Sequence, residues 1–565
     1  MSTPDLPTLS RFVWETRYRD PNASPAETEI EDTWRRVAAA VASREADAAS
    51  RQREFFEILS GYRFLPAGRI LAGAGTARHV TLFSCFVMGV IEDSIEGIFD
   101  ALKEGALTMQ RGGGIGYDFS TLRPRGGKAR STGMTASGPV SFLGMWDAMC
   151  STMLSTGVRR GAMMATLRCD HPDIGEFIDA KREPGVLRNF NLSVLVSDAF
   201  MRAVDDDAPW RLVFPAPPAA AVVARVVSAR DLWARLCASA HASAEPGVLF
   251  VDRINAWNNL GYCETLSATN PCGEEPLPPY GACNLGSINL TAFVRAPFEA
   301  AAVIDYAAIA ATARIAVRFL DNVIDISRFP LPQQREQAQR ARRIGLGMTG
   351  LGDSLAMLDL RYDSEPARQA AAQAMQTIRD AAYRASVELA AERGAFPAFV
   401  ADAYLERPFI KALPDEVRTG IRRYGIRNSH LTAIAPAGSI SLLAGNVSSG
   451  IEPIFQLEGT RRIIGAGGAP RQLAVKDHAW SAWLEKHSGS PPPRFVTGRD
   501  VSARDQLEMQ AALQPFVDSA ISKTVALADN FLASEVPELF RTAYRLGLKG
   551  CTIHRAQARA GVVTG

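Results

Sequence analysis

Asn270-Pro271-Cys272-Gly273-Glu274 is the stretch around which the rest of the chain is organised, and a further cysteine follows at position 283. Proline and glycine flank Cys272 and suit neither a helix nor a strand interior, so the stretch predicts a tight loop. Positions two apart can face the same side of an extended backbone. The loop can therefore present an amide, a thiol and a carboxylate to one small molecule. A surface turn with an ordinary small, buried cysteine is the alternative interpretation of the spacing.

The composition is that of a globular protein with a large core. The chain has 565 residues, of which 47% are hydrophobic and 22% charged, which allows two to four domains or one large barrel with appendages. Its net charge of +2 does not indicate a nucleic acid or a membrane surface as partner. The first twenty residues contain no apolar signal-peptide core, and no run of about 18 apolar residues occurs. We therefore expect no membrane association and a cytoplasmic location.

The cysteines and histidines argue against a disulfide scaffold and a metal site. Eight cysteines are too few for a scaffold in a chain of this length. No Cys-x-x-Cys pair occurs, so a zinc ribbon, a thioredoxin-like motif and a cysteine-ligated iron–sulfur cluster are not expected. No two histidines are spaced i, i+4 on a helix, so no metal site is expected. A functional disulfide would be a transient, catalytic one.

Helical and strand patterns alternate along most of the chain. Residues 1–60 mix apolar and charged residues at helical spacing, and residues 80–88 form an apolar, β-prone run. Further segments predict strands at 284–290 and 431–435 and helices at 300–329, 342–358 and 365–393; the chain after 500 reads as helical to about 548. Alternation across residues 80–450, without a fixed repeat, favours an α/β barrel or a doubly wound sheet.

Several glycine-rich loops could bring backbone N–H groups close to an anionic ligand. Residues 111–117 form such a loop, but it matches neither a Walker A motif nor a dinucleotide-binding fingerprint. Two loops rich in glycine and arginine, 123–130 and 155–161, could contact a nucleotide. The turn at 436–441 follows a β-like segment and could cradle a phosphate. A packing turn or solvated surface is the alternative for each loop taken alone.

Residues 270–290 resemble the finger-loop region of ribonucleotide reductases, and are most similar to the class II, adenosylcobalamin-dependent enzymes. Similar motifs occur at 83–93, 112–124, 137–141, 159–162, 169–174, 319–325, 344–347 and 435–441. The resemblance covers residues 60–460 well and 509–525 moderately. It implies an α/β fold: an N-terminal helical region (1–60), a ten-stranded α/β barrel with a central finger loop (61–460) and a C-terminal helical extension (461–565).

The resemblance also implies roles for single residues. Cys272 matches the cysteine whose thiyl radical abstracts the substrate 3′-hydrogen, Glu274 the base on the 3′-hydroxyl, and Asn270 the amide near the leaving 2′-hydroxyl. Cys85 and Cys283 match the pair that supplies protons and electrons and ends as a disulfide. The residues expected to bind substrate are Ser84, Gly113, Gly114, Pro436, Ala437, Gly438, Ser439 and Ile440. Those expected to bind a specificity effector are Asp93, Ser94, Arg123, Arg159 and Arg160.

The radical source is inferred from the similarity to class II enzymes and from motifs of the other classes that the sequence lacks. Residues 549–555, where a class I subunit carries two relay tyrosines, contain no tyrosine, and no glycyl-radical motif of class III occurs. Adenosylcobalamin is therefore the expected cofactor, bound without a protein histidine on cobalt. The alternatives are a class I-type subunit that needs a radical-generating partner, and an inactive reductase-like nucleotide-binding protein.

The partners expected from the resemblance are a ribonucleotide, with the diphosphate favoured, a deoxynucleoside triphosphate effector, and a thioredoxin- or glutaredoxin-type or small-thiol reductant. A homodimer is also expected. Two departures from the family pattern bear on these expectations. Cys551 alone lies near the C-terminal end, where relatives carry a cysteine pair on a tail, so either a tail is missing or an external reductant acts directly. Gly68 stands where many relatives have a serine or threonine that contacts substrate. The short N-terminal region leaves no room for an ATP-cone, so overall-activity regulation is not expected.

Overall fold

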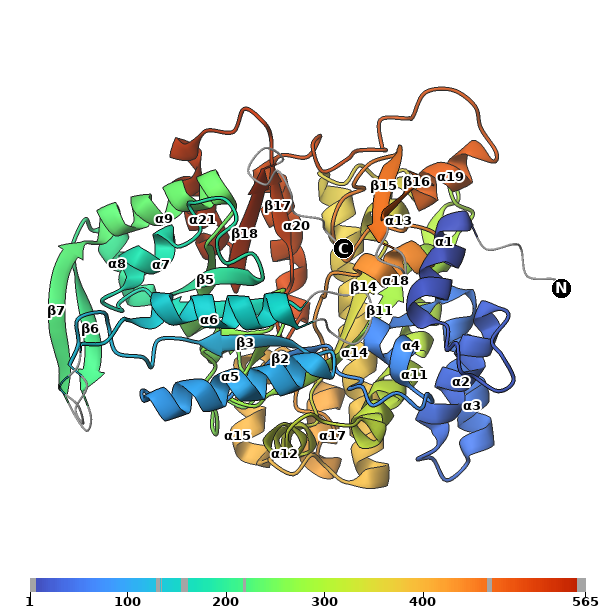
Figure 1. The fold of residues 1–565 in the computed structure, drawn as a ribbon. Coiled ribbons are helices and arrows are strands. Elements are labelled where there is room, and N and C mark those ends of the chain that lie inside the picture. Colours follow the sequence, from blue (N-terminus) through green and yellow to red (C-terminus); the bar gives the residue numbers. More distant parts are fainter. Residues whose placement is uncertain are drawn as a thin grey trace.

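The computed structural model describes residues 7–128, 133, 135–153, 161–216, 220–464 and 470–555. The N-terminal region is helical, as the sequence predicts. It consists of α1 (Thr8–Val13), a π-helical turn (Trp14–Tyr18), α2 (Ile30–Ala42) and α3 (Ala48–Leu59). Helices α2 and α3 pack against the long helix α11 (Tyr306–Ile326), which joins this region to the rest of the molecule (Figure 1).

Two sets of parallel strands form the large sheet. The first set runs in the order β2 (Cys85–Val87), β3 (Gly114–Asp118), β4 (Met163–Arg168), β5 (Phe190–Val196) and β8 (Gly247–Phe250). The second set contains the parallel pairs β11 (Ala282–Asn289) with β14 (Ile344–Thr349), and β17 (Thr524–Leu527) with β18 (Gly550–Arg555). The two sets meet in antiparallel pairs, β2 with β11 and β8 with β18.

Two single bridges connect the parts of the second set. Leu346 of β14 pairs with Thr432, and Ile434 pairs with Ile521, which leads into β17; both pairs are parallel. Together with the strand pairs, these bridges make a continuous circuit of backbone pairing through both sets. The sequence expectation of an α/β fold with a ten-stranded sheet is thus confirmed. The tenth strand of the sheet is the short strand β1 (Phe64–Pro66), which pairs antiparallel with β11.

Residues 342–358 differ from their predicted helix: they form β14, followed by the short helix α13 (Leu351–Met357). Gly345 and Gly347 lie two apart, so they face the same side of the strand. A Cβ at Gly347 would lie 2.2 Å from the Ala433 carbonyl oxygen, and one at Gly345 would lie 2.6 Å from Glu275 Oε1. The glycines therefore serve close contacts of a strand and do not mark one side of a helix.

Residues 461–565, predicted as a helical extension, contain the helices α19 (His478–Leu484), α20 (Ala503–Leu513) and α21 (Val536–Arg545). They also contain β17 and β18, two strands of the large sheet. β-Branched residues are frequent in both strands, which favours extended backbone. A two-stranded ribbon of β15 (Glu458–Ile464) and β16 (Pro470–Lys476) spans the start of this segment.

Helices cover the outside of the sheet. α5 (Ile95–Gln110) and α6 (Pro139–Thr152) lie side by side, and α5 packs on β3 (Figure 1). The other helices are α4 (Gly68–Gly73), α7 (Ile174–Asp179), α8 (Asp198–Asp205), α9 (Ala229–Ser243), α10 (Val251–Ala256), α12 (Pro332–Ala341), α14 (Glu365–Arg393), α15 (Ala401–Leu405), α16 (Pro408–Lys411), α17 (Asp415–Tyr424) and α18 (Gly438–Leu443). The outlying ribbons are β6 (Pro209–Ala216) with β7 (Ala220–Ser228), and β12 (Val294–Arg295) with β13 (Val303–Ile304). Among the described residues, no helix has the length and apolar character needed to cross a bilayer.

Candidate active site

The finger loop is the tip of a short hairpin. Strands β9 (Ala268–Thr269) and β10 (Pro276–Leu277) pair antiparallel and leave residues 270–275 between them. Asn270 closes this loop: its backbone N–H donates to the Glu275 carbonyl (3.2 Å), and its Oδ1 accepts from the Glu275 N–H (3.0 Å). Gly273 has φ +83°, a left-handed conformation that favours glycine, so the sequence Cys-Gly fits the turn.

The loop lies against strands of both halves of the circuit. In the first half, a Cβ at Gly116 of β3 would lie 1.8 Å from the Thr269 carbonyl oxygen. Asn191 of β5 donates from its side chain to the Pro271 carbonyl (2.7 Å). On the other side, the Ala520 N–H, just before β17, donates to the Glu274 carbonyl (2.9 Å). Contacts to both sets of strands place the finger loop inside the circuit, as the sequence interpretation predicts.

Cys272 is the exposed residue of the loop, whereas Asn270 and Glu274 are each 1% exposed. The side-chain amide of Asn270 donates to Cys85 Sγ at 3.1 Å. The Cys85 thiol in turn faces Glu274 Oε1 at 3.7 Å. The structure therefore gathers the loop amide, the loop carboxylate and the thiol from β2 around one point, beside an accessible thiol at the loop tip.

Cys85 and Cys283 are direct partners across the antiparallel seam of β2 and β11. Directly opposed residues in such a pair have Cα atoms about 4.5–5.5 Å apart, within the range of about 4.4–6.8 Å that disulfides span. Both are free thiols in this structure and both are buried. The register of the sheet therefore holds the two sulfurs where a disulfide can form with little movement of the backbone.

Burial keeps both seam thiols protonated. It raises the pKa of the Cys85 thiol well above its ordinary value; the charge of Glu274 adds to this, and the Asn270 hydrogen bond opposes it. Burial also raises the pKa of the Cys283 thiol, with the charge of Glu275 as the next cause. A thiol that stays protonated at neutral pH can deliver both a proton and electrons, which a reductive step needs.

Glu275 is a buried carboxyl that the sequence analysis did not single out. Its Oε2 accepts from the Ser519 hydroxyl (3.1 Å), and burial, with the neighbouring charges of Glu274 and Asp518, raises its pKa to about 8. The Lys549 ammonium donates to the carbonyls of Asp518 (2.6 Å) and Ser519, the residue whose hydroxyl contacts Glu275. The sequence signal that could have pointed to Glu275 is the pair of adjacent acidic residues at 274 and 275.

The raised pKa of Glu275 leads to a stability prediction. Between its ordinary value of 4.5 and about 8, the folded chain keeps this proton while the unfolded chain loses it, so the free energy of unfolding falls as pH rises through that interval. Glu275→Gln removes the titration. Between pH 5 and pH 8, the free energy of unfolding of the variant should rise by on the order of 3 kcal/mol relative to that of the native chain. Denaturation at both pH values measures this difference.

Glu96→Gln, which changes an exposed residue of α5, is the control for Glu275→Gln. Parallel pH profiles of the free energy of unfolding for Glu275→Gln and the native chain would contradict the raised pKa of Glu275.

The predicted substrate residues fall in two places. Ser84, Gly113 and Gly114 lie where β2 and β3 begin: the Gly114 N–H donates to the Ser84 carbonyl (2.9 Å), and a Cβ at Gly114 would lie 3.1 Å from the Pro271 ring. The second place is the turn at 436–440. It follows the bridge-forming residues Thr432 and Ile434, its residues 438–440 are the first residues of α18, and the Ala437 N–H donates to Ser449 Oγ (2.8 Å).

The structure places three of the predicted effector residues together. Arg123 donates from Nε to Asp93 Oδ2 (2.8 Å) and from its backbone N–H to Asp93 Oδ1 (3.1 Å). Ser94 caps α5, its hydroxyl accepting from the Gly97 N–H (3.0 Å). Arg159 and Arg160 lie outside the described residues. These contacts alone do not establish an effector role, because an Asp–Arg ion pair beside a helix N-terminus can also simply stabilise the fold.

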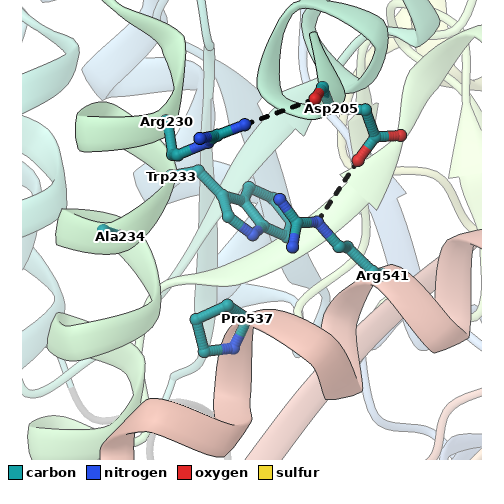
Figure 2. A pocket seen from close by; sticks show the side chains of 6 residues that line it. All are labelled: Asp205, Arg230, Trp233, Ala234, Pro537 and Arg541. Atoms are coloured by element: carbon teal, nitrogen blue, oxygen red, sulfur yellow. Dashed lines mark hydrogen bonds and ion pairs between the residues drawn. The ribbon is translucent and has the colours of Figure 1, made fainter. Parts of the chain in front are cut away.

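A separate surface pocket of about 360 Å³ lies between α8, α9 and α21, and Figure 2 shows the side chains that line it. Asp205 bridges its two arginines: its carbonyl accepts from Arg230 (3.3 Å) and its carboxylate pairs with Arg541 (3.4 Å). The pocket shares no lining residue with the finger loop. Across the residues that the structure describes, no group of three histidine, cysteine or acidic side chains could hold a metal ion.

Comparison with known proteins identifies the family. The model of the ribonucleotide reductase barrel domain matches residues 83–554, and that of the ribonucleotide reductase all-alpha domain matches residues 5–79. The chain belongs to the ribonucleotide reductase family. The vitamin B12-dependent ribonucleoside-diphosphate reductase of Mycobacterium tuberculosis is 40% identical to this reductase over 98% of the chain and 79% of the relative.

Two further relatives carry similar names. The vitamin B12-dependent ribonucleoside-diphosphate reductase of Thermoplasma acidophilum is 36% identical over 94% of this chain and 68% of its own length. The vitamin B12-dependent ribonucleotide reductase of Streptomyces coelicolor is 28% identical over 91% of this chain and 60% of its own length. The resemblance read from residues 270–290 therefore extends to nearly the whole reductase.

Proposed function

We propose that this reductase converts ribonucleoside diphosphates to 2′-deoxyribonucleoside diphosphates by thiyl-radical chemistry, with adenosylcobalamin as radical source. One observation carries the proposal: an accessible thiol, Cys272, stands at the tip of a loop whose Asn270 and Glu274 meet Cys85, and Cys85 opposes Cys283 across the seam. The names of the Mycobacterium tuberculosis and Thermoplasma acidophilum relatives both contain the terms diphosphate and B12. The product class serves deoxyribonucleotide biosynthesis.

Each residue of the site has a step in this proposal. The Cys272 thiyl takes the hydrogen atom from C3′, while Glu274 accepts the 3′-hydroxyl proton. The 2′-hydroxyl then leaves as water, with Asn270 beside it and Cys85 as proton donor. Cys85 and Cys283 supply two electrons and two protons and become a disulfide, and Cys272 returns its hydrogen to C3′. In sum, a ribonucleotide and two thiols give a deoxyribonucleotide, a disulfide and water.

Adenosylcobalamin fits the residues present. Its cobalt sits in its own ring, so it requires no ligand set from the chain; what it requires is an open approach to Cys272. Among the residues that the structure describes, no atom outside the loop neighbours lies within 4 Å of where a Gly273 Cβ would be, and Cys272 is exposed. The open space beside these two residues would receive the reactive end of the cofactor, which supplies the radical when bound. The buried positions of Asn270 and Glu274 keep water from the reacting carbons.

The partners follow from the same proposal. A thioredoxin- or glutaredoxin-type protein or a small thiol would reduce the Cys85–Cys283 disulfide after each turnover. A deoxynucleoside triphosphate would bind near Asp93 and Arg123 as effector. We place the reaction in the cytoplasm, a compartment that keeps thiols reduced. We also propose that residues 1–60 form the helical region and that residues 61–460 form the barrel together with β17 and β18.

A homodimer through α5 is part of the proposal. The helix and the residues before it carry four exposed apolar side chains: Val90, Ile95, Phe99 and Leu107. Phe99→Glu should weaken a dimer at least about a hundredfold, because a charge would replace a central aromatic contact. Light scattering after gel filtration measures the mass. Phe455→Glu, which changes an exposed aromatic residue away from α5, should leave the dimer intact. A native chain that is monomeric at micromolar concentration contradicts this interface.

The experiment that tests the function uses the chain alone. We expect dCDP from CDP with adenosylcobalamin and dithiothreitol and without a second protein, and less product from CTP. Product that appears only when a radical-generating protein is added would favour the class I-type alternative. Deoxynucleotide binding without turnover under any of these conditions would favour the inactive nucleotide-binding protein.

A further inference from the structure

Tyr18, at the end of the π-helical turn of the N-terminal region, contacts the turn at 436–440. Its hydroxyl donates to Ser439 Oγ at 2.6 Å, although the two residues are 421 positions apart. Tyr18 is 3% exposed. A side chain of the helical region therefore reaches into the turn that the proposed function assigns to substrate phosphates.

The direction of this hydrogen bond matters for what Ser439 can do. A serine hydroxyl has one proton to donate and can accept two hydrogen bonds. Because Ser439 Oγ accepts from Tyr18, its own proton remains for another acceptor. A phosphate oxygen accepts only, so a serine fixed as acceptor on one side is prepared to donate to phosphate on the other.

Buried contacts hold Tyr18 in place. Arg36 donates to the Tyr18 carbonyl (3.1 Å) and to the Leu71 carbonyl of α4 (3.2 Å), and it is ion-paired with the buried Glu27 (2.6 Å). The phenol fills space beside Gly68: a Cβ at this glycine would lie 3.1 Å from Tyr18 Oη. A side chain at position 68 would therefore require the phenol to shift by a few tenths of an ångström.

We propose that Tyr18 is a positioning residue of the substrate site: its hydroxyl fixes Ser439 so that the serine proton is free to bind a phosphate oxygen of the ribonucleotide. The helical region is then part of the substrate site as well as a support for the barrel. This inference rests on the proposed function, in which the turn at 436–440 binds the substrate phosphates.

A purely structural role is the competing explanation, and the chain offers a matched control for it. Ser10 of α1 makes a second buried hydrogen bond between the helical region and α18, from its hydroxyl to the Leu442 carbonyl (3.1 Å). Leu442 lies outside the turn. Ser10→Ala therefore removes a comparable contact between the same elements without touching Ser439.

The test compares Tyr18→Phe, Ser439→Ala, their double variant and Ser10→Ala in the full chain. Tyr18→Phe should raise the KM for CDP about five- to tenfold and leave kcat within about twofold, since it weakens one hydrogen bond to bound phosphate. Ser439→Ala should raise KM by a similar factor, and the double variant should add little to either. Ser10→Ala should lower Tm while KM stays unchanged. Calorimetry of CDP binding gives the same comparison independently of turnover.

Two results would overturn the proposal. One is an unchanged affinity for CDP in Tyr18→Phe. The other is a Tyr18→Phe effect of the same size when Ser439 is already alanine, because the effect would then not pass through Ser439. Failure of the proposed function is distinct, because the native chain and Ser10→Ala would then not form dCDP either.

Discussion

Cys272→Ser should abolish deoxynucleotide formation, lowering kcat by more than about a thousandfold. An O–H bond is much stronger than an S–H bond, so a serine at the loop tip cannot be converted to the radical that takes hydrogen from C3′. The side chain is exposed and close in size to the native one, so the fold should be retained. Product formation from CDP measures the loss, and the melting temperature confirms folding.

Cys263→Ser is the matched control for this change. Cys263 is also exposed, and it lies outside the finger loop and the seam. It should keep full turnover, so loss of activity would be specific to position 272. Deoxynucleotide formed by Cys272→Ser at a tenth of the native rate or more would exclude Cys272 as the radical site.

Cys283→Ser should remove the reductive half of the reaction. The native chain, reduced beforehand and freed of external thiol, should form about one deoxynucleotide per chain, because the seam pair holds two electrons and two protons. With Cys283 replaced, Cys85 alone cannot complete a disulfide across the seam, and we expect less than about a tenth of an equivalent of product. Quenched single-turnover assays measure both.

Exchange of the 3′-hydrogen separates this defect from a general one. Cys272 remains in Cys283→Ser, so hydrogen abstraction at C3′ should still occur with a 3′-tritiated substrate, whereas it should be absent in Cys272→Ser. One full equivalent of deoxynucleotide from Cys283→Ser would contradict the role of the seam pair. If exchange were also lost in Cys283→Ser, that variant would have a damaged fold and not only a missing reductant.

Much of the site could be predicted from local sequence. Pro271 and Gly273, on either side of Cys272, indicate a loop, and the spacing of Asn270 and Glu274 indicates a common target. The opposition of Cys85 and Cys283 could not be derived in this way. It depends on the register of β2 against β11, which is a pairing between segments almost two hundred residues apart, and only the family resemblance suggested it.

Other features depended on tertiary contacts that local patterns do not carry. Glycines at 345 and 347 suggested one side of a helix, but they serve a strand pressed against Glu275 and Ala433. Strands β17 and β18 are short, and α21 separates them in the sequence, so their place in the sheet follows from the strands with which they pair. The contact of Tyr18 with Ser439 joins residues that are 421 positions apart in the sequence.

Identification of the disulfide formed in one turnover tests the central claim most directly. The reduced chain is mixed with adenosylcobalamin and CDP without external thiol, quenched, alkylated and analysed by peptide mass spectrometry. We expect a Cys85–Cys283 disulfide in an amount equal to the dCDP formed, with Cys272 recovered as an alkylated thiol. Product formed while Cys85 and Cys283 remain thiols, or a disulfide that contains Cys272, would contradict the account.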